Sequence, residues 1–195
     1  MNIMHLLVLL WALLAAPFWE SKAPRDWTDR ELIGMLSNSP WARPATAEGA
    51  VRLPDVQTYL GSALPMQEAE AEAIRRGRMS LSPEFEDFRE FLKKRKGESI
   101  VLTVAFPYPD ELADREEAKR MEEECVMKVG RKKYKMTGHF PPAPNDPNLR
   151  LVFPRAIGPA DKIVEFDLYL PGALPPYRTA EYLVKELIWR GKLEL

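Results

Sequence analysis

Proline is the residue that most limits what this chain can fold into, because 18 of its 195 residues are prolines spread along the sequence. A proline ring fixes φ and removes a backbone donor, so prolines end helices and are excluded from central strands. Their spread therefore predicts many short elements joined by stiff loops. The length leaves room for one sizeable core or two small ones.

The N-terminal apolar run, Leu6 to Phe18, is interrupted only by Pro17. It is shorter than the ~20 residues of a membrane-spanning helix and has the length of a secretory signal region. No Lys or Arg precedes it, and Pro17 directly follows Ala15-Ala16. We expect residues 1–18 to be a signal peptide, with an uncleaved N-terminal anchor or a misassigned start codon as alternatives. The expected location is the periplasm or the outside of the cell. No cysteine follows the apolar run, so a lipoprotein anchor is not expected.

The stretch RDWTDRELIGMLSNSPW (25–41) predicts a short helix of about two to three turns. Thr28 and Glu31 have the spacing of a capping box, in which hydroxyl and carboxylate each satisfy a free backbone N–H. Asn38 suits the end of the helix, and Pro40 prevents its continuation.

Two tryptophans flank this helix, Trp27 before it and Trp41 after it. They are the candidate ligand or partner contact residues, because exposed aromatic side chains are common at binding surfaces. The alternative, which we favour, is packing: Trp27 and Leu32 occupy the positions of a hydrophobic staple, and Trp41 would cover the helix end. Catalytic residues remain unknown.

The rest of the chain is expected to form about six strands with helices placed before the strongest strand. That strand is SIVLTVAF (99–106), where the apolar pattern changes to a period of two. The preceding helices are expected within 66–78 and after Ser82. A connector is expected over 42–54, a charged helix over 109–125, and further strands over 56–65, 126–140, 149–155, 162–172 and from 179.

Hairpin-length connections favour antiparallel pairing over parallel βαβ winding. The predicted fold class is α+β: a mainly antiparallel, β-sandwich-like sheet with an inserted pair of helices, preceded by a signal peptide and a short N-terminal helix. An open α+β sheet is the second choice. The expected organisation is residues 1–18 as signal or anchor, 19–48 as short helix and connector, and 49–195 as a single β-rich domain with its helical insertion at 66–96.

Thiol and imidazole chemistry is limited to Cys125, His139 and His5, and His5 lies in the expected signal. Cys125 is most simply a buried, inert thiol, and a catalytic Cys125–His139 pair is the alternative. One histidine beside one cysteine is too few for a zinc site, so no metal and no cofactor are expected. The sequence also contains no G-x-S-x-G elbow, G-x-G-x-x-G loop or Walker A motif.

Charged residues give no clear site either. Adjacent acids at 122–124 point apart on a helix, and Asp146, near Asn145 and Asn148, lacks the glycine turn and final Glu of an EF-hand. The basic run 131–135 is typical of edge-strand protection. Because the formal net charge is −1, we do not expect nucleic-acid binding.

Three short motifs resemble a group of exported bacterial proteins, some of which carry a GWxTD domain. They are the W-T-D-R-E helix leading into SPW (27–41), FPR (153–155) and the terminal G-K-L-E-L (191–195). The sequence has Asp26-Trp27-Thr28-Asp29 without a leading glycine, so the similarity is to the exported relatives of this group. The resemblance implies an exported β-rich domain and supplies no catalytic residue.

Three functions are consistent with these observations. The first is a non-enzymatic binding or structural module of the cell envelope, whose partner would be another envelope protein. The second is a hydrolase-type enzyme that uses carboxylates. The third is a membrane-tethered accessory subunit, touching the membrane only through residues 1–18 if they stay uncleaved. An enzyme should have a pocket with converging polar groups, and a binding module an exposed apolar patch.

Overall fold

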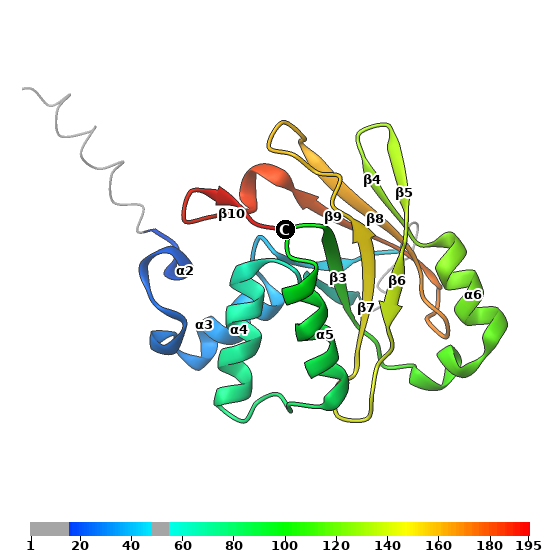
Figure 1. Ribbon diagram of the computed structural model, residues 1–195, viewed down its shortest axis with the longest axis horizontal. Coiled ribbons are helices and arrows are strands. Elements are labelled where there is room, and N and C mark those ends of the chain that lie inside the picture. Colours follow the sequence, from blue (N-terminus) through cyan, green and yellow to red (C-terminus); the bar gives the residue numbers. More distant parts are fainter. Residues whose placement is uncertain (1–15, 48–54) are drawn as a thin grey trace, which may run out of the picture.

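Two antiparallel sheets and several helices make up the computed structural model, which describes residues 16–47 and 55–195 (Figure 1). The five-stranded sheet has the order β1 (Ala42–Ala45), β2 (Val56–Leu60), β3 (Ser99–Ala105), β7 (Asn148–Pro154), β6 (Gly138–Phe140). The four-stranded sheet has the order β5 (Lys132–Lys135), β4 (Val126–Val129), β8 (Ile163–Tyr169), β9 (Tyr177–Leu183). The predicted α+β class with antiparallel sheets is confirmed.

Helices α4 (Leu64–Arg75) and α5 (Pro83–Lys94) lie between β2 and β3 in the sequence, as expected. They pack side by side on one face of the five-stranded sheet (Figure 1). Phe85 and Phe88 of α5 pack there against Val101 and Val152 of the two central strands. The aromatic residues Phe85 and Phe88, three positions apart on α5, therefore mark the face buried on the sheet.

The stretch 56–65 is not strand throughout: β2 ends at Leu60, and α4 begins at Leu64. Pro65 lies in the first turn of the helix, where its missing N–H removes no intrahelical hydrogen bond. The residue preceding the helix, Ala63, provides no side-chain cap, so the start of α4 is marked in the sequence by Pro65 rather than by a capping residue.

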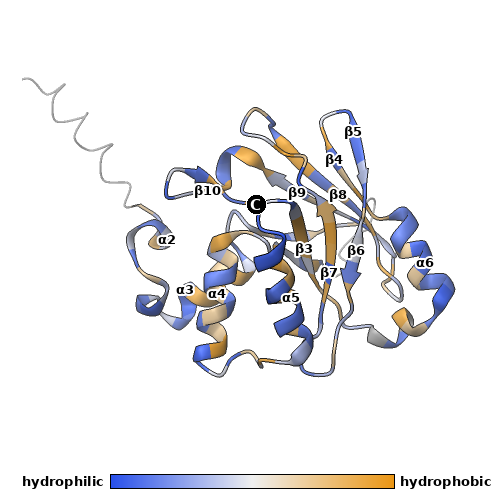
Figure 2. Ribbon diagram, in the orientation of Figure 1, coloured by the Kyte–Doolittle hydropathy of each residue, from blue (hydrophilic) through white to orange (hydrophobic). Residues whose placement is uncertain are grey.

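The other face of the five-stranded sheet joins the main core. Its side chains alternate along β3 and β7, and Phe153 meets Phe166 of β8 with ring centroids 5.3 Å apart. The central strands β3 and β7 are accordingly hydrophobic (Figure 2). At one edge, Thr46 and Thr179 exchange two backbone hydrogen bonds and so connect the end of β1 with β9.

The N-terminal part consists of α2 (Phe18–Ser21), a 3-10 turn (Pro24–Asp26) and α3 (Asp29–Ser37). The predicted capping box is present: Thr28 Oγ1 accepts from the Glu31 N–H, and Glu31 accepts from the Thr28 N–H. Of the expected signal segment, residues 1–15 lie outside the described part of the chain. Phe18 packs on Trp27 at 5.5 Å, so it belongs to the folded body.

The connector expected over 42–54 contains a strand, β1. It is the edge strand of its sheet, which explains how Pro44 is tolerated without a backbone donor. Residues 48–54 lie outside the described part.

Later elements follow the expected order. A 3-10 turn (Pro109–Ala113) and α6 (Arg115–Glu124) precede the β4–β5 hairpin, whose turn contains Gly130 at φ 59°. Helix α6 is largely hydrophilic (Figure 2). The C-terminal residues form a 3-10 turn (Val184–Glu186) and a small hairpin, β10 (Ile188–Trp189) with β11 (Lys192–Leu193). Within residues 16–47 and 55–195, none of the helices is long and apolar enough to cross a membrane.

Candidate functional site

A buried group of four polar side chains lies where α4 and α5 cover the five-stranded sheet. Tyr59 comes from β2, Glu70 from α4, Arg150 from β7, and Asp146 from the loop before β7. The strand register explains the assembly, because Tyr59 pairs with Thr103 and Thr103 pairs with Arg150. Paired residues of neighbouring strands share a face, so this row lies beneath the helices.

Hydrogen bonds connect the four side chains into one network. The Tyr59 hydroxyl donates to Glu70 Oε1 at 2.7 Å, and the Arg150 guanidinium donates to both oxygens of Asp146 at 2.6 and 3.2 Å. Arg150 also approaches Glu70 Oε1 to 4.0 Å. Glu70 is 2% exposed and Arg150 1% exposed, so the network is almost entirely removed from water.

Burial determines the proton affinity of Glu70. Loss of hydration raises the pKa of its carboxyl to about 7, although the Arg150 charge and the Tyr59 hydrogen bond act in the opposite direction. Burial and the nearby Glu70 charge raise the pKa of Tyr59 well above its ordinary value. Arg150 is further stabilised by Phe85 and Phe88, whose ring centroids lie 5.1 and 4.6 Å from the guanidinium carbon.

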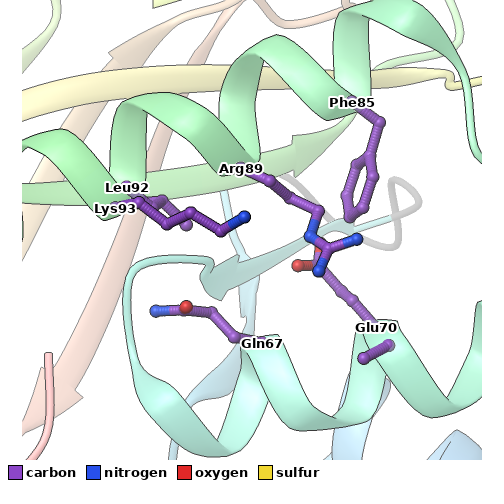
Figure 3. A pocket seen from close by; sticks show the side chains of 7 residues that line it. Gln67, Glu70, Phe85, Arg89, Leu92 and Lys93 are labelled. Carbon is purple, nitrogen blue, oxygen red and sulfur yellow. The ribbon is translucent and has the colours of Figure 1, made fainter.

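A small cavity of about 90 Å³ adjoins this network between α4 and α5 (Figure 3). Glu70 and Gln67 line it from α4, and Arg89 and Lys93 line it from α5 together with the apolar Phe85 and Leu92. Figure 3 shows Arg89 reaching from α5 toward Glu70. A buried carboxyl thus faces two cationic side chains across a space large enough for a few solvent-sized groups.

A second hollow, of about 350 Å³, is also lined by residues of the network. Tyr59 and Asp146 line it, together with Met79 and Ser80 from the α4–α5 connection and Asn145 from the proline-rich loop. The buried network therefore contributes side chains to two hollows.

The structure places both candidate contact residues in the core. Trp27 is 3% exposed and Trp41 is 0% exposed. Trp41 packs edge-on against Trp19 and Trp189, with centroids 6.4 and 6.0 Å apart, and its indole N–H donates to the Glu194 carbonyl. This burial agrees with the packing alternative, and a direct contact role for the two rings stays a prediction.

Asp146 is not an open oxygen ligand, because Arg150 and the Asn148 side-chain amide already donate to its carboxylate. Among the described residues, no group of three or more His, Cys, Asp or Glu side chains has an arrangement suited to a metal ion. Calcium at this loop would have to displace the buried guanidinium.

Cys125 and His139 have different neighbours. The buried Cys125 Sγ lies 3.4 Å from the Tyr169 backbone nitrogen, and burial raises the thiol pKa to about 12. His139 Nδ1 lies 3.4 Å from a Glu122 carboxylate oxygen. A thiol with so high a pKa forms little thiolate at neutral pH, which disfavours the Cys–His catalytic alternative.

The acidic and basic runs have the structural positions expected from the sequence, on a helix and on an edge strand. Glu123 and Glu124 pair with Lys119 and Arg120 one helical turn away on α6. The basic run 131–135 occupies the β4–β5 hairpin, and β5 is the edge strand of its sheet.

Sequence reasoning missed Tyr59, Glu70 and Arg150. Glu70 stands among alternating Glu and Ala residues that predict a helix with charge on most faces, although the face of α4 that carries Glu70 is buried. Arg150 gave the better signal, since a cation between Leu149 and Leu151 in an apolar strand must find a buried partner. Comparison of the chain with family models, curated proteins and solved structures found no match.

Proposed function

We propose that this chain is an exported, non-enzymatic binding or structural module of the cell envelope. The observation that supports this most is the pairing within the buried network: Arg150 binds both oxygens of Asp146, and Tyr59 binds Glu70. The most chemically capable side chains near the hollows thus hold the helices on the sheet. They form the floor of a small recognition cavity rather than a free acid–base pair.

A scaffold of this kind suits a sandwich-like arrangement, which we include in the proposal. Contact between Phe153 and Phe166 links the inner faces of the two sheets, and the Thr46–Thr179 hydrogen bonds join them at one edge. Such a scaffold would hold α4 and α5 rigidly over the sheet.

The attachment of α2 concerns the end of the apolar run. Phe18, the last residue of that run, contacts Trp27, and the next residue, Trp19, contacts Trp41, so the end of the run is packed into the fold. If residues 1–18 are left uncleaved, this attachment would place the domain against a membrane as a tethered accessory subunit. Cell fractionation and N-terminal sequencing of the protein from its native host test the location and separate the exported form from the tethered one.

The hydrolase alternative has one observation in its favour, the Glu70 pKa of about 7, which is suitable for general acid–base catalysis near neutral pH. A panel of model glycan, ester and peptide substrates would separate the two functions. For a binding module, wild type and Glu70→Gln should show the same background hydrolysis. Turnover by the wild type that disappears in Glu70→Gln would replace the proposal with the enzymatic one.

A further inference from the structure

The cavity between α4 and α5 has an ordered charge distribution. Its buried side is formed by the Glu70 carboxyl, and its rim carries Arg89 and Lys93, which are one helical turn apart on α5. Glu70 is buried, whereas both cations are exposed. Arg89 lowers the Glu70 pKa through its charge without forming an ion pair with it, and both side chains line the cavity.

Neither rim cation is neutralised by the protein within residues 16–47 and 55–195. Arg89 and Lys93 make no ion pair there, whereas the adjacent Lys94 pairs with Glu90 at 3.0 Å on the same helix. On the buried side, Tyr59 satisfies Glu70 Oε1, and Arg150 remains 4.0 Å away and bound to Asp146. The cavity therefore offers an acidic group at its base and cationic groups at its rim.

We propose that this cavity binds a small free α-amino acid, with its ammonium group against Glu70 and its carboxylate against Arg89 and Lys93. An α-amino acid carries its ammonium and carboxylate groups on one carbon, which matches a carboxylate and two cations that line the same small cavity. A peptide terminus presents one of these charges, so it would leave the other side of the cavity unmatched. Gln67 can add a polar contact from α4.

The volume limits the size of the ligand. Since a water molecule occupies about 30 Å³ of liquid, 90 Å³ accommodates about three non-hydrogen atoms, so even glycine, the smallest amino acid, would extend to the open rim. Phe85 and Leu92 give the cavity an apolar side that suits a hydrogen or methyl substituent. Larger side chains would have to project past the rim.

This inference names a ligand for the binding role proposed above and rests on it. Isothermal titration calorimetry of the full chain should detect saturable binding of glycine and alanine. Acetate and methylammonium, which carry one charge each, should bind at least about tenfold more weakly. Binding of acetate as tightly as alanine, or no binding of either amino acid, would overturn the inference. The hydrolysis panel tests the binding role separately.

Matched variants locate the ligand. Arg89→Gln changes an exposed side chain and should weaken alanine binding at least about tenfold, whereas Lys94→Gln on the same helix should leave it unchanged. Glu70→Gln should also abolish binding, and the Arg89 variant keeps the test valid if the buried substitution impairs folding. Equal affinity in wild type and Arg89→Gln would place any ligand elsewhere and refute the site.

The pH dependence provides an independent readout. The ammonium group requires an ionised Glu70, which is faced by Tyr59 from β2, Arg150 from β7 with its partner Asp146, and the two α5 cations. Because burial holds the Glu70 pKa at about 7, alanine affinity should fall roughly tenfold between about pH 8 and about pH 6. Affinity that is constant or rises over this interval would contradict ammonium binding at Glu70.

Discussion

The Tyr59 hydroxyl donates a 2.7 Å hydrogen bond to Glu70 and so joins strand β2 to helix α4 inside the protein. This bond can form with a charged or a neutral carboxyl. Burial, however, favours the neutral form and raises the Glu70 pKa from its ordinary 4.5 to about 7. The charge state of one side chain beneath the helices therefore depends on pH near neutrality.

Glu70 should make the protein less stable as the pH rises. The folded chain binds the Glu70 proton more tightly than the unfolded chain, so this protonation stabilises the fold. The stabilisation is complete below about pH 4.5 and is lost as the pH rises to about 7. In total, the free energy of unfolding falls by about 3 kcal/mol over this range. Glu70→Gln keeps an acceptor for Tyr59 without a charge, so at about pH 8 it should be more stable than wild type.

Urea unfolding between about pH 5 and pH 8 checks this prediction. The exposed substitution Glu90→Gln serves as a control, because it removes a carboxylate from α5 outside the buried network. Parallel stability curves for wild type and Glu70→Gln across this range would mean that Glu70 does not retain its proton in the fold.

Asp146→Asn should be strongly destabilising at every pH in this range. The guanidinium of Arg150 is 1% exposed and depends on both Asp146 oxygens. Removing one partner of a buried pair leaves an uncompensated charge and typically costs about 3–5 kcal/mol. Chemical denaturation measures the loss, and Asp87→Asn on the exposed side of α5 is the control. A loss no larger than that of the control would show that Arg150 finds adequate compensation elsewhere.

Trp27→Ala should lower the free energy of unfolding by about 3 kcal/mol, because the buried ring contacts Phe18 and its removal leaves a cavity. Trp27→Phe should lose less, since an aromatic ring remains and the indole N–H has no hydrogen-bond partner among the described residues. Thermal unfolding measures both. Unchanged unfolding of Trp27→Ala together with loss of a partner in a pull-down would restore the contact interpretation of this ring.

The sequence predicted those features of the fold that depend on local patterns. Thr28 and Glu31 specified a helix start through neighbouring backbone groups, and the period-two apolar pattern of 99–106 specified strand β3. Strand β1 was missed because the edge position that permits Pro44 is a property of the whole sheet. The site was missed for the same kind of reason: Glu70 and Arg150 are 80 positions apart, and only the packing of α4 on β7 brings them together.

Cys125 should be unreactive in the folded protein. Its thiol pKa of about 12 results from burial, so almost no thiolate is present near neutral pH. A thiol reagent such as dithionitrobenzoate should react at about pH 8 only after denaturant is added. The unfolded protein is its own control, because it reports complete labelling of the single cysteine. Rapid labelling under native conditions would indicate that α6 opens readily from β8, whose Tyr169 backbone contacts the thiol.

Gly61→Ala should destabilise the protein through a contact beneath α5. A Cβ at Gly61 would lie 2.5 Å from Thr103 Oγ1 and 3.4 Å from Phe88 Cζ, so the neighbours must move. Overpacking of this kind costs about 1–3 kcal/mol. Adding Thr103→Ala removes the nearer atom, and the double variant should therefore lose less stability than the two single losses added together.

Gly34→Ala is the matched control, since its Cβ would meet no atom within 4 Å and Gly34 lies inside helix α3. Alanine favours a helix by about 1 kcal/mol over glycine, so this variant should be more stable than wild type. In urea unfolding, glycine-to-alanine substitution should therefore lower the free energy of unfolding at position 61 and raise it at position 34. If the Gly61 and Thr103 losses simply add, the cost at Gly61 does not arise from the threonine hydroxyl, and the turn after β2 is constrained by its backbone instead.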